Sequence, residues 1–135
     1  MLFRSPSGAT PGMPRVSLRD LALAVRRAVR AEAERAECRV DLDAGFEEVS
    51  ATAGSLELTL RSLLSATISA LPIGSAAQLA GMPASPGRAR VAIITQPPLS
   101  NPEEVAAAAR SIADCTGATV GAEADGSVWA EVAEG

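Results

Sequence analysis

Histidine, lysine and tyrosine are missing from this chain of 135 residues. Without histidine, the chain can form neither a Ser-His-Asp triad nor a phosphohistidine, and the usual zinc sites and an imidazole base are excluded as well. Without lysine, it has neither a Schiff-base amine nor the lysine of a Walker phosphate loop. Aromatic residues make up only 2% of the chain, so nucleobases would find few side chains on which to stack.

Basic charge is also scarce, and all of it comes from arginine. The net charge is -4 and the sequence pI is about 4.8, so the overall basic footprint of a nucleic-acid-binding protein is missing. Arg26, Arg27 and Arg30 form a local basic group. This group is either a solvated helix face balanced by nearby glutamates or a surface for a partner.

Cysteines and long apolar runs are few. Cys38 and Cys115 lack metal-ligand spacing and are too few for a disulfide framework, so we expect each to be a free, buried thiol. The sequence contains neither an apolar run long enough to span a membrane nor a compact signal-peptide core. We therefore expect a cytoplasmic protein that holds no cofactor or metal and has neither nucleic acid nor membrane as a partner.

The chain is expected to form one domain. Residues 1–16 contain three prolines and two glycines, which is typical of a flexible leader, and residues 17–135 then form the domain. Apolar residues at helical spacing predict three helices, over about 18–36, 54–71 and 102–116.

Strands are predicted between these helices and after the last one. Alternating residues indicate strands at 38–42 and 47–51, and a continuous apolar run indicates a buried strand at 91–94. Residues 72–89 read as a loop with a helical turn at 76–80. Asp125-Gly126 predicts a hairpin that joins strands at 119–123 and 127–131.

This order predicts an α/β (α+β) two-layer sandwich, with a mixed β-sheet of about five strands and three helices on one face.

Four segments of the sequence resemble those of the ATP-binding domain of histidine kinases and their relatives (the GHKL superfamily, with the Bergerat fold). The segment SLELTLRSLLSATISALP resembles the helix called the N-box, and VAIITQPP resembles the strand that ends in the first glycine box. The segments at either end, RVSLRDLALAVRRAVRAEAERAECRVDLD and PEEVAAAARSIADCTGATVGAEADGSVWAEV, resemble the leading helix and strand and the closing helix and hairpin.

The residues that hold nucleotide in that superfamily are not matched. Its N-box has two asparagines four residues apart, where this chain has Ser62 and Ala66. Its first glycine box has an adenine-binding aspartate and glycines, where this chain has Gln96-Pro97-Pro98. Its phosphate-binding second glycine box corresponds to a stretch with Glu103 and Glu104, and the lid before it is reduced to three residues.

The resemblance and these losses together predict a non-catalytic protein-interaction or regulatory module in bacterial signalling. Its partner would be another protein, either a second copy of this chain or a two-component signalling protein. The apolar stretch at 71–86, with Ile73, Leu79 and Met82, is one candidate surface, unless it folds back into the core. The face of Arg26, Arg27 and Arg30 is the other candidate.

Two alternative functions remain at this stage. In the first, Ser62, Ser65, Ser69 and Gln96 line a vestigial cleft that binds a nucleotide or other small ligand. In the second, the acids Asp41, Asp43, Glu47 and Glu48 serve an enzyme of another kind. Because these acids flank an expected turn, a solvated surface is the simpler interpretation of them.

Overall fold

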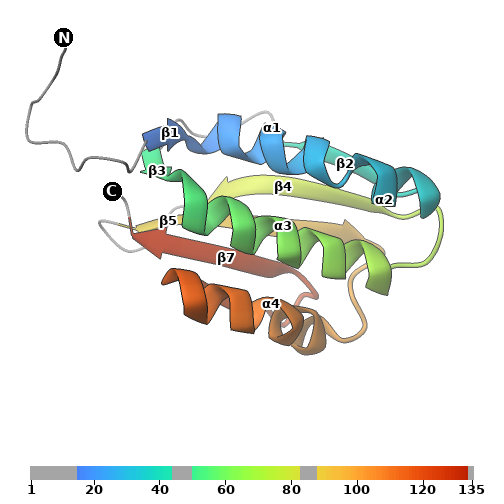
Figure 1. Ribbon diagram of the computed structural model, residues 1–135. Helices are drawn as coiled ribbons and strands as arrows, with labels where there is room; N and C mark the ends of the chain where they lie inside the picture. The colour runs from blue at the N-terminus through green and yellow to red at the C-terminus, as the bar shows by residue number, and fades with distance from the viewer. Residues whose placement is uncertain (1–14, 44–49, 83–87, 134–135) are drawn as a thin grey trace, which may run out of the picture.

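A computed structural model of the chain describes residues 15–43, 50–82 and 88–133. The helices form one layer that covers a single face of the main sheet, as Figure 1 shows. The elements are β1 (Arg15–Ser17), α1 (Leu18–Ala28), α2 (Arg30–Arg35), β2 (Arg39–Leu42), β3 (Ser50–Thr52), α3 (Ala53–Ala70), β4 (Ala76–Met82), β5 (Arg88–Gln96), α4 (Pro102–Thr116), β6 (Thr119–Ala122) and β7 (Val128–Ala133).

The main sheet has five strands in the order β2-β4-β5-β7-β6. Strands β2 and β4 are parallel, with Val40 opposite Ala77, and every other neighbouring pair is antiparallel. The predicted mixed sheet of about five strands in a two-layer sandwich is therefore confirmed.

The core lies between the two layers. Side chains of α3 supply much of it, because Leu56, Leu60, Leu63 and Leu64 are all fully buried. Leu79 of β4 and Ile93 of β5 meet them from the sheet and are fully buried too. The aliphatic composition thus builds a core without aromatic residues, and this core fixes the positions of α3 and of the strands under it.

The first predicted helix is two helices that nearly continue one another. Val29 separates α1 from α2, yet its backbone N–H donates to Val25 and its carbonyl accepts from Ala33, so helical hydrogen bonding runs through the junction. Helix α2 ends at Arg35 with Ala36 as its C-cap, and Glu37 follows with a φ of 51°. The predictions for α3 and α4 are confirmed to within one residue at each end.

The predicted helical turn at 76–80 is wrong, because Ala76–Met82 form strand β4. Alanine favours helix locally, but here β4 pairs with β5 along its whole length, from Ala76 opposite Gln96 to Met82 opposite Arg90. Pairing with the neighbouring strands and burial of side chains in the interior of the sheet outweigh this local preference for helix.

The expected strand at 47–51 falls partly on residues 44–49, which lie outside the described residues. Its described part belongs to β3, which pairs with β1 in a separate two-stranded sheet, Val16 opposite Ala51. The expected leader overlaps β1 at Arg15–Ser17, and its other residues lie outside the description.

The predicted closing hairpin is present, formed by β6 and β7. At its turn, Gly126 has a φ of 91°, a left-handed conformation that glycine adopts without a Cβ clash. Gly117 is the C-cap of α4 and has a φ of 80°. Asn101 is the N-cap of this helix and Pro102 lies in its first turn, although the Asn101 side chain makes no capping hydrogen bond.

Candidate functional site

Three of the four residues expected to line a vestigial cleft lie together on α3. Ser62, Ser65 and Ser69 border a depression of about 480 Å³, which Ala66 also lines. Its other walls come from α2 and α4. The depression therefore lies on the side of α3 that faces away from the sheet.

The chemistry of this depression does not suit a metal–phosphate group. Ser65 Oγ donates to the carboxylate of Glu32 from α2, so this hydroxyl is already bound to an acidic group. Ala66, at the position of the family's metal-binding asparagine, offers no oxygen, and Mg²⁺ requires oxygen ligands. The residues present therefore do not fit magnesium nucleotide.

Gln96, the fourth expected cleft residue, lies elsewhere. It borders a second depression of about 410 Å³ with Gln78, Ile94 and Arg39, a group that excludes all three serines. Gln78 and Ile94 are exposed neighbours on β4 and β5. Sequence reasoning grouped Gln96 with the serines, and the structure does not bring them together.

Thr95 is a residue that the sequence reasoning missed. Its side chain is buried, and Thr95 Oγ1 has no hydrogen-bond partner among the described residues. Alternation along β5 gives Thr95 the same facing as Ile93, so Thr95 and not Gln96 faces the helix layer at the end of the strand. The alternation of buried and exposed residues along a strand, counted from Ile93, would have identified Thr95 as a buried residue.

Helix α4 packs closely against α3. Its inner side is made of small residues, and Ala106, Ala109 and Ala113 are at most 1% exposed. The hydroxyl oxygens of Thr59 on α3 and Thr116 on α4 lie 3.1 Å apart. Helix α4 therefore lies beside α3 in the helix layer, as Figure 1 shows, and the Thr59–Thr116 contact joins the two helices.

The segment that replaces the family's lid is short and packed down. Leu99 is buried. A Cβ added to Gly126 in the β6–β7 turn would lie 2.8 Å from Pro98 Cβ and 3.1 Å from the Leu99 nitrogen. The hairpin turn therefore rests on this segment. Glu103 and Glu104 lie in the first turn of α4. Their negative charges interact favourably with the positive end of the helix dipole.

The first candidate partner surface is not a surface at Leu79. The Leu79 side chain is fully buried. This part of the stretch therefore folds back into the core, which was the alternative interpretation. Ile73, by contrast, is 72% exposed. Met82 ends β4, and its side chain is not described. Leu79 as an exposed contact is therefore wrong, because β4 is an interior strand between β2 and β5 and Leu79 faces the core.

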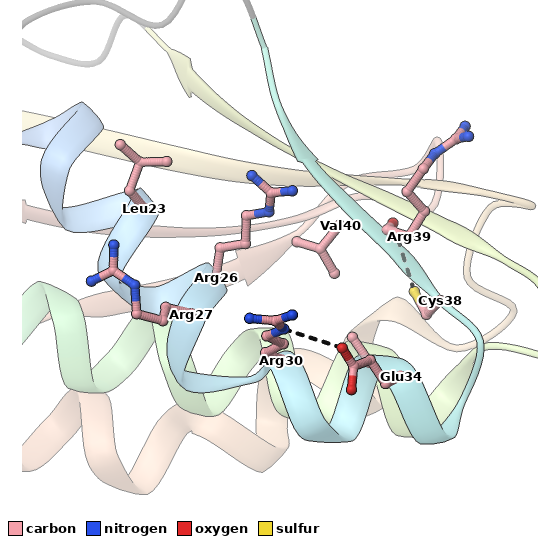
Figure 2. Close-up of a pocket in the computed structure, with 9 residues that line it drawn as sticks. Leu23, Arg26, Arg27, Arg30, Glu34, Cys38, Arg39 and Val40 are labelled. Carbon is pink, nitrogen blue, oxygen red and sulfur yellow. Dashed lines mark hydrogen bonds and ion pairs between the residues drawn. The ribbon is translucent and has the colours of Figure 1, made fainter.

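The second candidate surface is hollowed. Arg26, Arg27 and Arg30 line a groove of about 410 Å³ between α1, α2 and β2. Figure 2 shows the side chains of Arg26 and Arg30 directed toward the space beside Val40. Arg30 also pairs with Glu34 at 3.1 Å. We call this hollow the α1–β2 groove.

The remaining candidate groups do not assemble a reactive site among the described residues. Asp41 pairs with Arg39 at 3.0 Å, Glu47 and Glu48 lie outside the description, and no described cluster of acids and cysteines could hold a metal. Burial raises the pKa of the Cys38 thiol. Cys115 is exposed on α4, so its expected burial is wrong. In the described part, no helix is both long and apolar enough to cross a membrane.

Histidine kinases are among the solved structures with a similar fold. A nucleotide-free catalytic domain of histidine kinase ThkA superposes with a TM-score of 0.66, at 15% identity, over 90% of this chain and 96% of that one. The Acinetobacter baumannii histidine kinase AdeS gives 0.63 at 15% identity, over 90% of this chain and 66% of that one.

Histidine kinase ThkA in complex with response regulator protein TrrA gives a TM-score of 0.66 at 14% identity, over 90% of this chain and 42% of that one. No protein-family model matches the sequence, and no curated protein matches it. The fold of this chain is therefore that of histidine kinase catalytic domains, as the resemblance implied.

Proposed function

We propose that this chain is a protein-binding module that retains the fold of a histidine kinase ATP-binding domain and works in bacterial signalling without nucleotide. The observation that carries this proposal is the hydrogen bond from Ser65 to the carboxylate of Glu32, which places an acid in the depression beside α3. In the family to which the fold is similar, nucleotide is held along the N-box helix. Here the depression beside that helix contains this carboxylate, which would repel phosphate.

Other side chains support the same conclusion. Ala66 gives no metal ligand, and the depression beside it contains the carboxylate of Glu32. Pro97 and Pro98 have no backbone N–H with which to bind a ligand. Glu103 and Glu104 would repel phosphate from the start of α4. Each feature disfavours a different part of magnesium ATP: the metal, the base and the phosphates.

The proposed role is binding rather than phosphoryl transfer. The chain contains no histidine, so it cannot carry a phosphohistidine itself. The partner class is suggested by the histidine kinase structure that holds a response regulator. We therefore propose a two-component signalling protein as the partner.

The proposal is tested with purified two-component proteins encoded beside the gene for this chain. Each is immobilised, and association of the full chain is followed by biolayer interferometry with and without 1 mM magnesium ATP. We expect at least one protein to bind with a Kd below about 100 μM, equally well in both conditions. Association that requires nucleotide, or no association with any of them, would contradict the proposal.

A further inference from the structure

The α1–β2 groove joins an open strand edge to a row of arginines. Strand β2 is the first in the sheet order and pairs only with β4, so no described strand covers its other edge. The backbone N–H groups of Arg39 and Asp43 donate to β4, to Ser75 and Leu79. Because backbone groups alternate along a strand, those of Val40 point to the open edge.

The charge of the groove is opposite to that of the whole chain. Its lining contains four arginines and one glutamate, Glu34, in a protein of net charge -4. Arg30 is bonded to Glu34 and Arg39 to Asp41. Arg26 and Arg27 have no ion-pair partner within the described ranges, so their charges are available to an anionic ligand. The Arg30–Glu34 pair is exposed and joins Arg30 through Nε, and because exposed pairs of this kind are weak, an anionic ligand can compete for Arg30 as well.

The spacing of the arginines matches an extended chain. Arg26 and Arg30 are four residues apart, and the hydrogen bonds through Val29 keep this part of the chain helical, so they stand about 6 Å apart along the axis. Side chains on one face of a strand recur every second residue, about 7 Å apart. A strand added to β2 would therefore present alternate side chains to Arg26 and Arg30.

We propose that the α1–β2 groove binds an acidic peptide segment of the partner, which adds to the open edge of β2 as an extra strand. Carboxylates at alternate positions pair with Arg26 and Arg30, and the peptide backbone bonds to Val40. This inference rests on the proposed function, since it names the segment by which the partner binds. A peptide fits better than a nucleic acid, which has no backbone to complement a strand edge and is repelled by the chain's net charge.

The probe is a fluorescein-labelled, end-blocked octapeptide in which two glutamates alternate with valines, titrated with the full chain and followed by fluorescence anisotropy. We expect saturable binding that weakens as salt rises. Arg26→Ala and Arg30→Ala should each weaken it at least tenfold. Arg110→Ala removes the same charge from the exposed side of α4 and should leave it unchanged.

Two further peptides separate strand addition from plain charge attraction. A peptide with its two glutamates adjacent, and one with an N-methyl group on the valine between them, should both bind at least tenfold more weakly. Equal binding of either peptide would overturn the proposal, as would no binding of the parent peptide. Equal displacement by an eight-nucleotide thymidine oligomer would also overturn it, in favour of a general polyanion site.

The two proposals can fail separately. If a two-component protein binds the chain but Arg26→Ala and Arg30→Ala leave that association unchanged, the groove is wrong and the proposed function stands. If none binds while the peptide does, the groove is real and the proposed partner class is wrong. Circular dichroism spectra equal to the parent's are required of each variant, and Arg27→Ala is the replacement if Arg30→Ala unfolds.

Discussion

The hydroxyl oxygen of Thr59 on α3 lies 3.1 Å from that of Thr116 on α4, so the two helices touch through a pair of short side chains. Thr116 Oγ1 also donates to the carbonyl of Ile112, one turn earlier in α4. The link can therefore form without leaving a buried hydroxyl unpaired. It holds the C-terminal end of α4 beside the helix that resembles the N-box.

The close packing of α4 should make its inner face intolerant of larger side chains. Ala109 is fully buried, so Ala109→Leu should lower the free energy of unfolding by about 1–3 kcal/mol through overpacking. Ala107, on the exposed side of the same helix, is the matched control, and Ala107→Leu should change it by less than about 0.5 kcal/mol. Urea denaturation of both variants provides the measurement. Equal stabilities would mean that this face of α4 is not packed against the core.

The contact between the hairpin turn and the short lid segment can be isolated with two glycines. Gly126 and Gly74 both have left-handed φ values, 91° and 87°, so replacement by alanine strains the backbone at each, by about 1–3 kcal/mol. An added Cβ would meet Pro98 and Leu99 at Gly126, but nothing within 4 Å at Gly74. Gly126→Ala should therefore lower the melting temperature more than Gly74→Ala. The same loss in both would show that the turn does not press on residues 98–99.

Asp125 should make the free energy of unfolding decrease as the pH is lowered. Its carboxylate accepts hydrogen bonds from the Ser127 side chain at 2.7 Å and from the Ser127 backbone N–H at 3.0 Å, which lower the pKa of Asp125. A carboxyl whose pKa is lowered by folding adds stability above its unfolded pKa, about 3.9, and loses it as pH falls through the lower folded value.

The measurement is urea denaturation of the parent and of Asp125→Asn at several pH values from 6 to 2. The stability advantage of the parent should be constant above about pH 5 and shrink below about pH 4. Ser127→Ala removes the larger cause of the lowered pKa, and its difference from the parent should shrink over the same range. A difference that stays constant down to pH 2 would refute this role for Asp125.

The two cysteines should react at very different rates. Cys38 is 7% exposed and burial raises its pKa, which lowers its thiolate fraction, whereas Cys115 is exposed. Iodoacetamide at pH 8 should therefore label Cys115 at least tenfold faster, as followed by mass spectrometry of the intact chain. Cys115→Ser should abolish the fast phase. Equal rates would contradict the burial of the Cys38 thiol.

Helix periodicity predicted the helix layer well because its apolar stripes are long. The stripe through Leu60, Leu64 and Ile68 is buried as the spacing requires, and Asp125-Gly126 marked the hairpin because few sequences allow that turn. Strand β4 was missed because its residues, rich in alanine and glycine, have no alternation, and only the neighbouring strands β2 and β5 fix its conformation. The separate β1–β3 pairing is likewise a long-range arrangement that local patterns do not encode.

The sequence predicted individual residues of the candidate site but not how all of them are grouped in space. The serines of α3 share a helix face, so their common depression follows from their spacing. Gln96 was grouped with them by its place at a strand end, but it borders a different depression, and Thr95 is the buried residue at that strand end. The α1–β2 groove depends on a helix and a strand edge meeting in space, so the sequence showed its arginines but not the hollow between them.

The central claim, that this fold works without nucleotide, is tested most directly by isothermal titration calorimetry. The full chain at 100 μM is titrated with magnesium ATP and magnesium ADP to 5 mM, and the Ala66→Asn variant, which adds an amide oxygen at the N-box position, is titrated in parallel. We expect no saturable heat for the parent, and none for the variant, since Pro97, Pro98, Glu103 and Glu104 still disfavour the base and the phosphates. A magnesium-dependent, one-site isotherm for the parent with a Kd of 1 mM or tighter would contradict the account.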